Sequence, residues 1–134
     1  MTQVIIFAND IGGVSICIPT GELPIEEVKI KDTPENSIIV DRDTLPNIDI
    51  DFFDAWELNG TTVSVNLTKA KEITKKRLRM ERESLLSKQD ILFQRALESG
   101  ADTTVIVAEK QRLRDITNLV DNCTTTEELR TLNC

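Results

Sequence analysis

The sequence has no histidine and no tyrosine, and aromatic residues make up only 4% of its 134 residues. Without histidine, the chain lacks the commonest general base and the usual activator of a serine or cysteine nucleophile. Zinc sites that mix cysteine and histidine ligands are excluded for the same reason. The phosphate-binding pattern G-x-x-x-x-G-K-[ST] is also missing. These absences predict a non-enzymatic protein that uses no metal and no other cofactor.

Cysteines and long apolar runs are scarce as well. Cys17, Cys123 and Cys134 are odd in number and form no C-x-x-C motif, which is typical of reduced thiols. The opening residues MTQVIIFANDIGG have no basic region, and Asp10 interrupts their apolar run, which argues against a signal peptide. No stretch approaches the roughly 20 apolar residues of a membrane helix. We therefore expect a soluble protein that is intracellular when it is made.

Charge is distributed unevenly along the chain. Residues 1–66 carry 12 acidic and 3 basic side chains, a net charge of −9, whereas residues 67–134 carry 11 acidic and 13 basic, a net charge of +2. The whole chain has a net charge of −7, so it repels phosphate, and nucleic-acid binding is not expected. The asymmetry suggests instead two surfaces that attract each other, within one chain or between chains.

The first half of the chain is rich in strand signals. QVIIFAN and VSICIPT flank the turn signal NDIGG and predict a hairpin over about 3–18. NSIIVD predicts a third strand. Between the second and third strands, Pro24 followed by two glutamates favours a short helix.

A second hairpin is predicted around Asn59-Gly60, which lies between two alternating runs. Both central residues of a type I′ turn need a positive φ, and Asn-Gly is the dipeptide that supplies it. A turn centred there pairs Leu58 with Thr61 and places Trp56 opposite Val63. We expect Trp56 to anchor the hairpin on the core.

Residues 67–99 predict one long helix, with Asn66 as its N-cap and Gly100 as its terminating residue. A helix of this length spans about 50 Å at 1.5 Å per residue. Its C-terminal half has a broad apolar face. A second helix over about 103–120, capped by Asp102, is long enough to cover that half and predicts an antiparallel helical hairpin.

The chain is predicted to finish in a short helix. Thr124 and Glu127, three residues apart in TTTEEL, form a capping box before it. With strands first and helices last, the fold class is α+β. We expect a β-rich acidic module over residues 1–66 and a helical hairpin arm with a short terminal helix over residues 67–134.

Two charged runs are candidate sites. Carboxylates from Asp41 to Asp54 lie close together and could ligate calcium or magnesium, but the EF-hand spacing fails, and a solvated loop is favoured. The segment from Lys71 to Glu83 holds six basic and three acidic side chains. A solvated helix face with i,i+4 pairs such as Arg77–Glu81 and Arg79–Glu83 is favoured there, with an acidic protein partner as the alternative.

The chain resembles small tail proteins of tailed bacteriophages, often described as tail or tail-fibre assembly chaperones. The resemblance rests on DAW…NG…V.VNLTKAKEITKKRLRMERESLLSKQDILFQRALESG, on KQRLRDIT and on the closing TTTEEL, with ICIPTGELPIEEV nearer the start. It implies a protein that acts in tail or tail-fibre assembly or attachment through protein–protein contacts. It also implies a place in the host cytoplasm during assembly, or in the virion tail if the protein is a permanent adaptor subunit. A small acidic phage protein that binds and regulates a host protein is the alternative.

The N-terminal half of the long helix is the candidate partner-binding segment. Its apolar residues continue past the reach of helix 103–120, which matches only Leu85 to Leu97 in length. We therefore expect this segment to contact a tail or tail-fibre protein, or another copy of the chain in a homo-oligomer. The candidate partner-binding residues are Ile73, Arg77, Leu78, Met80 and Arg82.

Overall fold

The computed structural model describes residues 2–134 and confirms the predicted α+β class, with small antiparallel sheets first and helices last. The chain divides into two compact units, Met1–Ala70 and Lys71–Cys134, which we call the N-terminal unit and the helical unit. The boundary lies a few residues beyond the expected one, inside the long helix α2, Leu67–Ser99. Among the residues described, no helix has the length and apolar content to cross a membrane.

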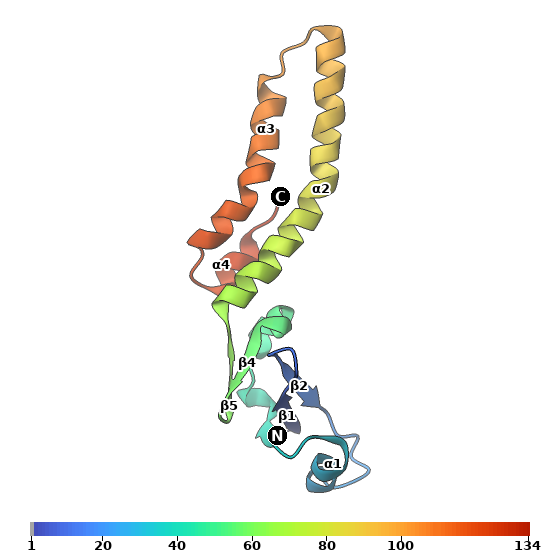
Figure 1. Ribbon diagram of the computed structural model, residues 1–134, viewed down its shortest axis with the longest axis vertical. Helices are drawn as coiled ribbons and strands as arrows, with labels where there is room; N and C mark the ends of the chain where they lie inside the picture. The colour runs from blue at the N-terminus through green and yellow to red at the C-terminus, as the bar shows by residue number, and fades with distance from the viewer. Residues whose placement is uncertain (1) are drawn as a thin grey trace. The chain divides into compact units, whose positions relative to one another are not determined.

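A three-stranded antiparallel sheet forms the centre of the N-terminal unit (Figure 1). The central strand is β1, Gln3–Ala8, and it pairs with β2, Val14–Cys17, on one side and with β3, Ile38–Asp41, on the other. The predicted first hairpin and third strand are thus confirmed. The run of three β-branched residues from Val4 to Ile6 is fully buried, because β1 has a neighbour on each edge and packed side chains on its faces.

Helix α1, Ile25–Asp32, covers part of this sheet through contacts with β1 and β3. Pro24 stands directly before it, and Glu26 and Glu27 occupy its first turn, where carboxylates favour the positive end of the helix dipole. Only Val28 of this helix is buried, and Ile30 is 83% exposed. The short helix expected after Pro24 is therefore present, and a single side chain anchors it.

The acidic run after β3 folds into two 3-10 helices, η1, Arg42–Thr44, and η2, Asn47–Ala55, in place of the expected solvated loop. The Asp41 carboxylate accepts a hydrogen bond from the Asp43 N–H at 3.0 Å and caps η1. Phe52 and Ala55 are buried and hold η2 on the core. Within residues 2–134, no three acidic or cysteine side chains gather in a way that could hold a metal ion.

The second hairpin forms between β4, Trp56–Asn59, and β5, Thr62–Val65, but in a different register from the predicted one. Leu58 lies opposite Val63 and Trp56 opposite Val65, so the turn is centred on Gly60 and Thr61. Gly60 has φ +64°, and no residue other than glycine has a positive φ among those described. A glycine at the first central position is the requirement of a type II′ turn, which replaces the expected type I′ turn.

Trp56 anchors this hairpin, as the sequence predicts. Its side chain is fully buried, and its ring lies 4.9 Å from that of Phe53. The indole Nε1 donates a hydrogen bond to the Asp49 carbonyl oxygen at 3.1 Å, so the one polar atom of the side chain has a partner. The same bond ties η2 to β4.

The positive φ of Gly60 can be tested by substitution. Gly60→Ala places a Cβ in the left-handed region and should lower the free energy of unfolding of the N-terminal unit by about 1–2 kcal/mol. Steric crowding does not contribute to this loss, because no atom lies within 4 Å of the added Cβ. Urea unfolding followed by the emission of Trp56, the only tryptophan in the chain, measures this unit. The control Thr61→Ala should change the value by less than about 0.5 kcal/mol, and equal losses in both variants would contradict the turn.

The long helix begins and ends as predicted. The Asn66 Oδ1 accepts a hydrogen bond from the Lys69 N–H at 3.1 Å, which is an N-cap contact. At the other end Gly100 has φ +70°, its N–H bonds to the Leu97 carbonyl, and the Ala101 N–H bonds to the Ala96 carbonyl at 2.9 Å. This pair of bonds is a Schellman motif.

The rest of the helical unit departs from the sequence prediction in two details. The second helix, α3, Thr104–Asp115, ends sooner than expected and continues as the 3-10 segment η3, Ile116–Asn122. The last helix, α4, Thr126–Thr131, is capped by Thr125, whose hydroxyl accepts from the Glu128 N–H at 3.2 Å. The capping pair is therefore one residue later than the predicted Thr124 and Glu127.

Candidate interaction surfaces of the helical unit

Helices α2 and α3 lie side by side and antiparallel, as the short connection between them predicts (Figure 1). Lys110 of α3 forms an ion pair with Asp90 of α2 at 2.7 Å, and its ammonium group lies 5.0 Å from the centre of the Phe93 ring. Ala96 and Leu113 are buried between more exposed neighbours. The hairpin is thus held by a small apolar seam and one cation that serves both helices.

The basic side chains near the start of α2 bind backbone carbonyl groups at the ends of other helices. Arg82 donates to the carbonyl oxygens of Leu113 and Arg114 in the last turn of α3, at 3.4 and 3.0 Å. Carbonyl groups in the last turn of a helix carry the negative end of its dipole. Arg82 therefore caps α3 from outside.

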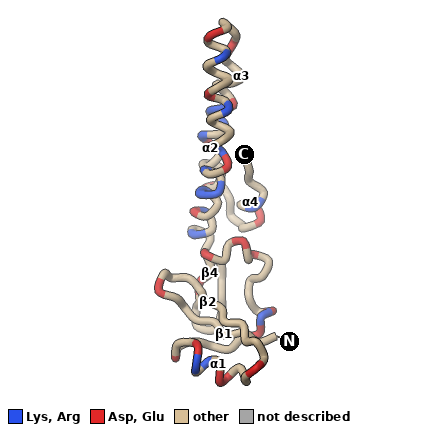
Figure 2. Tube along the Cα trace, turned by 90° about the vertical axis from the view of Figure 1, so that its right-hand side faces the viewer, with Lys and Arg blue, Asp and Glu red and all other residues tan. Residues whose placement is uncertain are grey.

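The same arrangement recurs at η3 and α4. Lys71 donates to the Asp121 carbonyl oxygen near the end of η3 at 3.3 Å, and Lys75 pairs with the Asp121 carboxylate at 2.9 Å. Arg77 donates to the carbonyl oxygens of Leu129 and Leu132 at 3.2 and 2.6 Å, at the end of α4. Each helical segment after α2 thus ends beside a basic side chain of α2. Figure 2 shows the row of basic residues along α2.

This finding changes the interpretation of two predicted partner-binding residues. The sequence predicts that Arg77 and Arg82 face a partner, but their guanidinium groups are occupied by the chain's own carbonyls. The predicted Arg77–Glu81 pair forms at 2.8 Å, whereas no Arg79–Glu83 pair is present among the residues described. The run from Lys71 to Glu83 is mainly an internal cap for the segments that follow it.

Leu78 is also predicted at an interface, and it is fully buried within the chain. The physical reason is that η3, α4 and the residues after α4 turn back along α2, beyond the reach of α3 alone. The Cys134 thiol lies 3.6 Å from the Leu78 carbonyl oxygen, and Leu129 is fully buried as well. Ile73 is half-buried, and Met80 is 69% exposed. Of the five predicted residues, Met80 is the most exposed apolar one.

Substitution at Leu78 tests whether this residue belongs to the core of the helical unit or to an interface. Leu78→Ala should lower the free energy of unfolding of the helical unit by about 2–5 kcal/mol, because it leaves a cavity in a buried site. Far-UV circular dichroism during urea unfolding measures this loss. Met80→Ala is the matched control and should cost less than about 0.5 kcal/mol. If Leu78→Asp stayed as helical and as stable as the parent chain, Leu78 would not belong to this core.

Arg77 should stabilise the helical unit more than its neighbour Arg79 does. Arg77→Gln removes two charge-assisted hydrogen bonds to carbonyl oxygens and the ion pair with Glu81, and we expect a loss of about 1–2 kcal/mol for this partly exposed group. Arg79 is exposed and has no partner among the residues described, so Arg79→Gln should be nearly neutral. Thermal melts at low and at moderate salt concentration compare the two variants. Losses of equal size would show that overall charge, not the carbonyl contacts, is what matters.

The closed end of the hairpin exposes several large apolar side chains. Beyond the contacts of Lys110, both helices present residues that no other segment of the helical unit covers. Exposed large apolar side chains on neighbouring helices are candidate contacts for another protein where they adjoin. The exposed residues there are Ile91 (53%), Leu92 (45%), Leu97 (56%), Val105 (80%) and Val107 (49%).

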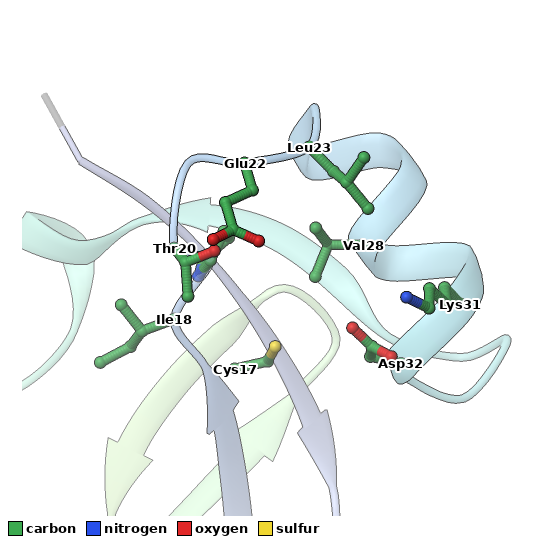
Figure 3. A pocket seen from close by; sticks show the side chains of 9 residues that line it. Cys17, Ile18, Thr20, Glu22, Leu23, Val28, Lys31 and Asp32 are labelled. Carbon is green, nitrogen blue, oxygen red and sulfur yellow. The ribbon is translucent and has the colours of Figure 1, made fainter.

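The N-terminal unit has a small cavity between the segment after β2 and helix α1 (Figure 3). The Cys17 thiol, the Glu22 and Asp32 carboxylates and the Lys31 amine line it. Its volume of about 170 Å³ is below the 300–1,000 Å³ range of typical small-molecule sites. Within residues 2–134 no hydrogen bond is present between the Cys17 thiol and either carboxylate. We assign no chemistry to this cavity.

The two other thiols are structural. Burial raises the pKa of the Cys123 thiol, and the Glu128 carboxylate adds to the effect. Burial also raises the pKa of the Cys134 thiol, with a further contribution from Glu81. A raised pKa keeps a thiol protonated and unreactive at neutral pH. Cys123 is buried and Cys134 is half-buried, and neither thiol is expected to react at neutral pH.

Comparison with protein-family models, with curated proteins and with solved structures gives no match. The function therefore has to be argued from the surfaces described above.

Proposed function

We propose that the chain is a non-enzymatic tail or tail-fibre-associated protein of a tailed bacteriophage, which acts in assembly or attachment through protein–protein contacts. The observation that carries the contact-based role is the set of exposed apolar side chains at the closed end of the α2–α3 hairpin. The bacteriophage assignment is supported by the sequence resemblance described above.

The exposed apolar residues favour the closed end of the hairpin as the partner-binding surface, in place of the N-terminal half of α2 that the sequence indicated. Near the start of α2, the basic side chains cap other helices and Leu78 is buried, so little apolar surface remains there. At the closed end, Leu92 and Val105 are 45% and 80% exposed on two neighbouring helices. Full burial of such a side chain contributes about 1.5–3 kcal/mol, so a partner that covers several of them gains substantial affinity.

Co-expression with the tail and tail-fibre proteins encoded beside this chain tests the proposal. We expect a stable complex with one of them, which the double variant Leu92→Lys, Val105→Lys weakens at least tenfold by placing two charges in an apolar contact. Ile11→Lys is the matched control, because Ile11 is 88% exposed in the turn between β1 and β2 and lies outside the helical unit. That variant should bind as the parent chain does.

Two results would count against the proposal. The absence of a complex with every tail and fibre protein would remove the assembly role. Loss of binding in Ile11→Lys, with retention in the double variant, would move the contact surface to the N-terminal unit. Mass spectrometry of purified virions then distinguishes a permanent adaptor subunit, which is present, from an assembly factor, which is absent.

The charge of the N-terminal unit favours a second candidate. Residues 1–70 carry 12 acidic and 4 basic side chains, a net charge of −8 (Figure 2). A unit of this charge suits a small phage protein that binds a basic surface of a host protein and regulates it. Such binding should weaken steeply as salt concentration rises, whereas an apolar contact at the hairpin end should not. Pull-downs from host lysate at low and high salt distinguish the two candidates.

A further inference from the structure

Helix α2 has an exposed side opposite α3, on which Met80 and Ile91 are the apolar residues. The residues that face α3, such as Phe93 and Ala96, are buried or half-buried, while the opposite side is open. We call this open side the outer face of α2. It consists of Met80, Ser84, Ser87, Ile91, Gln94 and Glu98, all exposed.

The spacing on the outer face is that of a coiled-coil seam. Its residues alternate in steps of three and four, so they occupy the a and d positions of a heptad repeat, with Ser84 and Ile91 at a and Met80 and Ser87 at d. Two serines in the middle allow the backbones to approach closely. Met80 is 69% exposed and Ile91 is 53% exposed, one on each side of these serines.

The flanking charges indicate what can bind there. In this register Glu83 and Asp90 occupy g positions, and Lys88 and Arg95 occupy the e positions five residues later. In a parallel coiled coil a g residue contacts the e residue of the next heptad in the partner helix. A second copy of α2 would therefore pair Glu83 with Lys88 of the partner subunit and Asp90 with Arg95 of the partner subunit, in both directions.

These charges are largely available. Glu83, Lys88 and Arg95 have no ion-pair partner among residues 2–134, and Asp90 is shared only with Lys110. The surface is also hollowed at this place. A shallow depression is lined by Asp90, Ile91, Gln94, Arg95 and Glu98, the position at which a side chain of a facing helix would insert.

We propose that the outer face of α2 binds a second copy of the same chain as a parallel helix pair, with Met80 and Ile91 in the seam. An antiparallel pair fits the charges less well, because g residues then face g residues. In that arrangement Glu83 lies near Asp90 of the partner subunit, and like charges repel. The small apolar content of the seam makes the association weak, in the upper micromolar range or above.

Charge-reversal variants of the full chain test the proposal by sedimentation equilibrium at low salt, from micromolar to millimolar protein. Glu83→Lys and Lys88→Glu each place like charges across the seam twice, and each should raise the dimer dissociation constant about tenfold. The two variants mixed in equal amounts should associate as tightly as the parent chain, because each supplies the charge that the other lacks. The double variant Glu83→Lys, Lys88→Glu should also recover.

Circular dichroism and the variant Ile91→Ser serve as controls for this experiment. Both positions are exposed, and Glu and Lys are both good helix formers, so unchanged far-UV circular dichroism is expected. Ile91→Ser should weaken association without recovery on mixing. A chain that stays monomeric at millimolar concentration overturns the proposal. Tighter association of Glu83→Lys overturns the parallel orientation, because in an antiparallel pair the introduced lysine would gain a contact with Asp90 of the partner subunit.

Discussion

The helical unit depends on cations of α2 that bind carbonyl oxygens at the ends of the segments after it. α3, η3 and α4 are short, and basic side chains of α2 reach carbonyl groups near the end of each. Arg82, Lys71 and Arg77 each reach one of these ends, and each places a positive charge where a helix dipole is negative. Leu78 and Leu129 are buried beside these contacts. The result is a unit in which one long helix serves as the template for three short ones.

This arrangement explains why the basic run resembles a binding site. In sequence, six basic residues between Lys71 and Glu83 outnumber the three acidic residues among them, so part of the positive charge looks available to a partner. The carbonyl acceptors of Lys71, Arg77 and Arg82 lie 31 to 55 residues further along the chain, and no motif marks a backbone carbonyl as an acceptor. The residues left over, such as Arg79, are the exposed ones. A charge run on a helix therefore has to be checked against the helix ends around it before it is assigned to a partner.

Features that depend on residues close together in the sequence could be predicted, whereas features that depend on long-range packing could not. The bounds of α2 followed from Asn66 and Gly100, because each cap is made by residues within a few positions. The register of the second hairpin did not follow. Pairing Trp56 with Val63 or with Val65 leaves every side chain on the same face of the hairpin, since the two registers differ by two residues. The φ of Asn59 decides between them, because the predicted type I′ turn needs a positive φ at both Asn59 and Gly60, and only glycines have a positive φ among the residues described. The return of the chain along α2, which buries Leu78, is a long-range contact that periodicity does not show.

The long sequence separation of the α2 contacts has a consequence for synthesis on the ribosome. All strand pairings of the N-terminal unit lie between residues 3 and 65, so its sheets can form before most of α2 has been made. Arg77, in contrast, lies 52 and 55 residues before the carbonyls that it binds. While those residues are still being made, α2 carries bare guanidinium groups and an uncovered Leu78. During that interval, acidic or apolar surfaces nearby can bind the nascent helix, including those of chaperones and of other nascent copies.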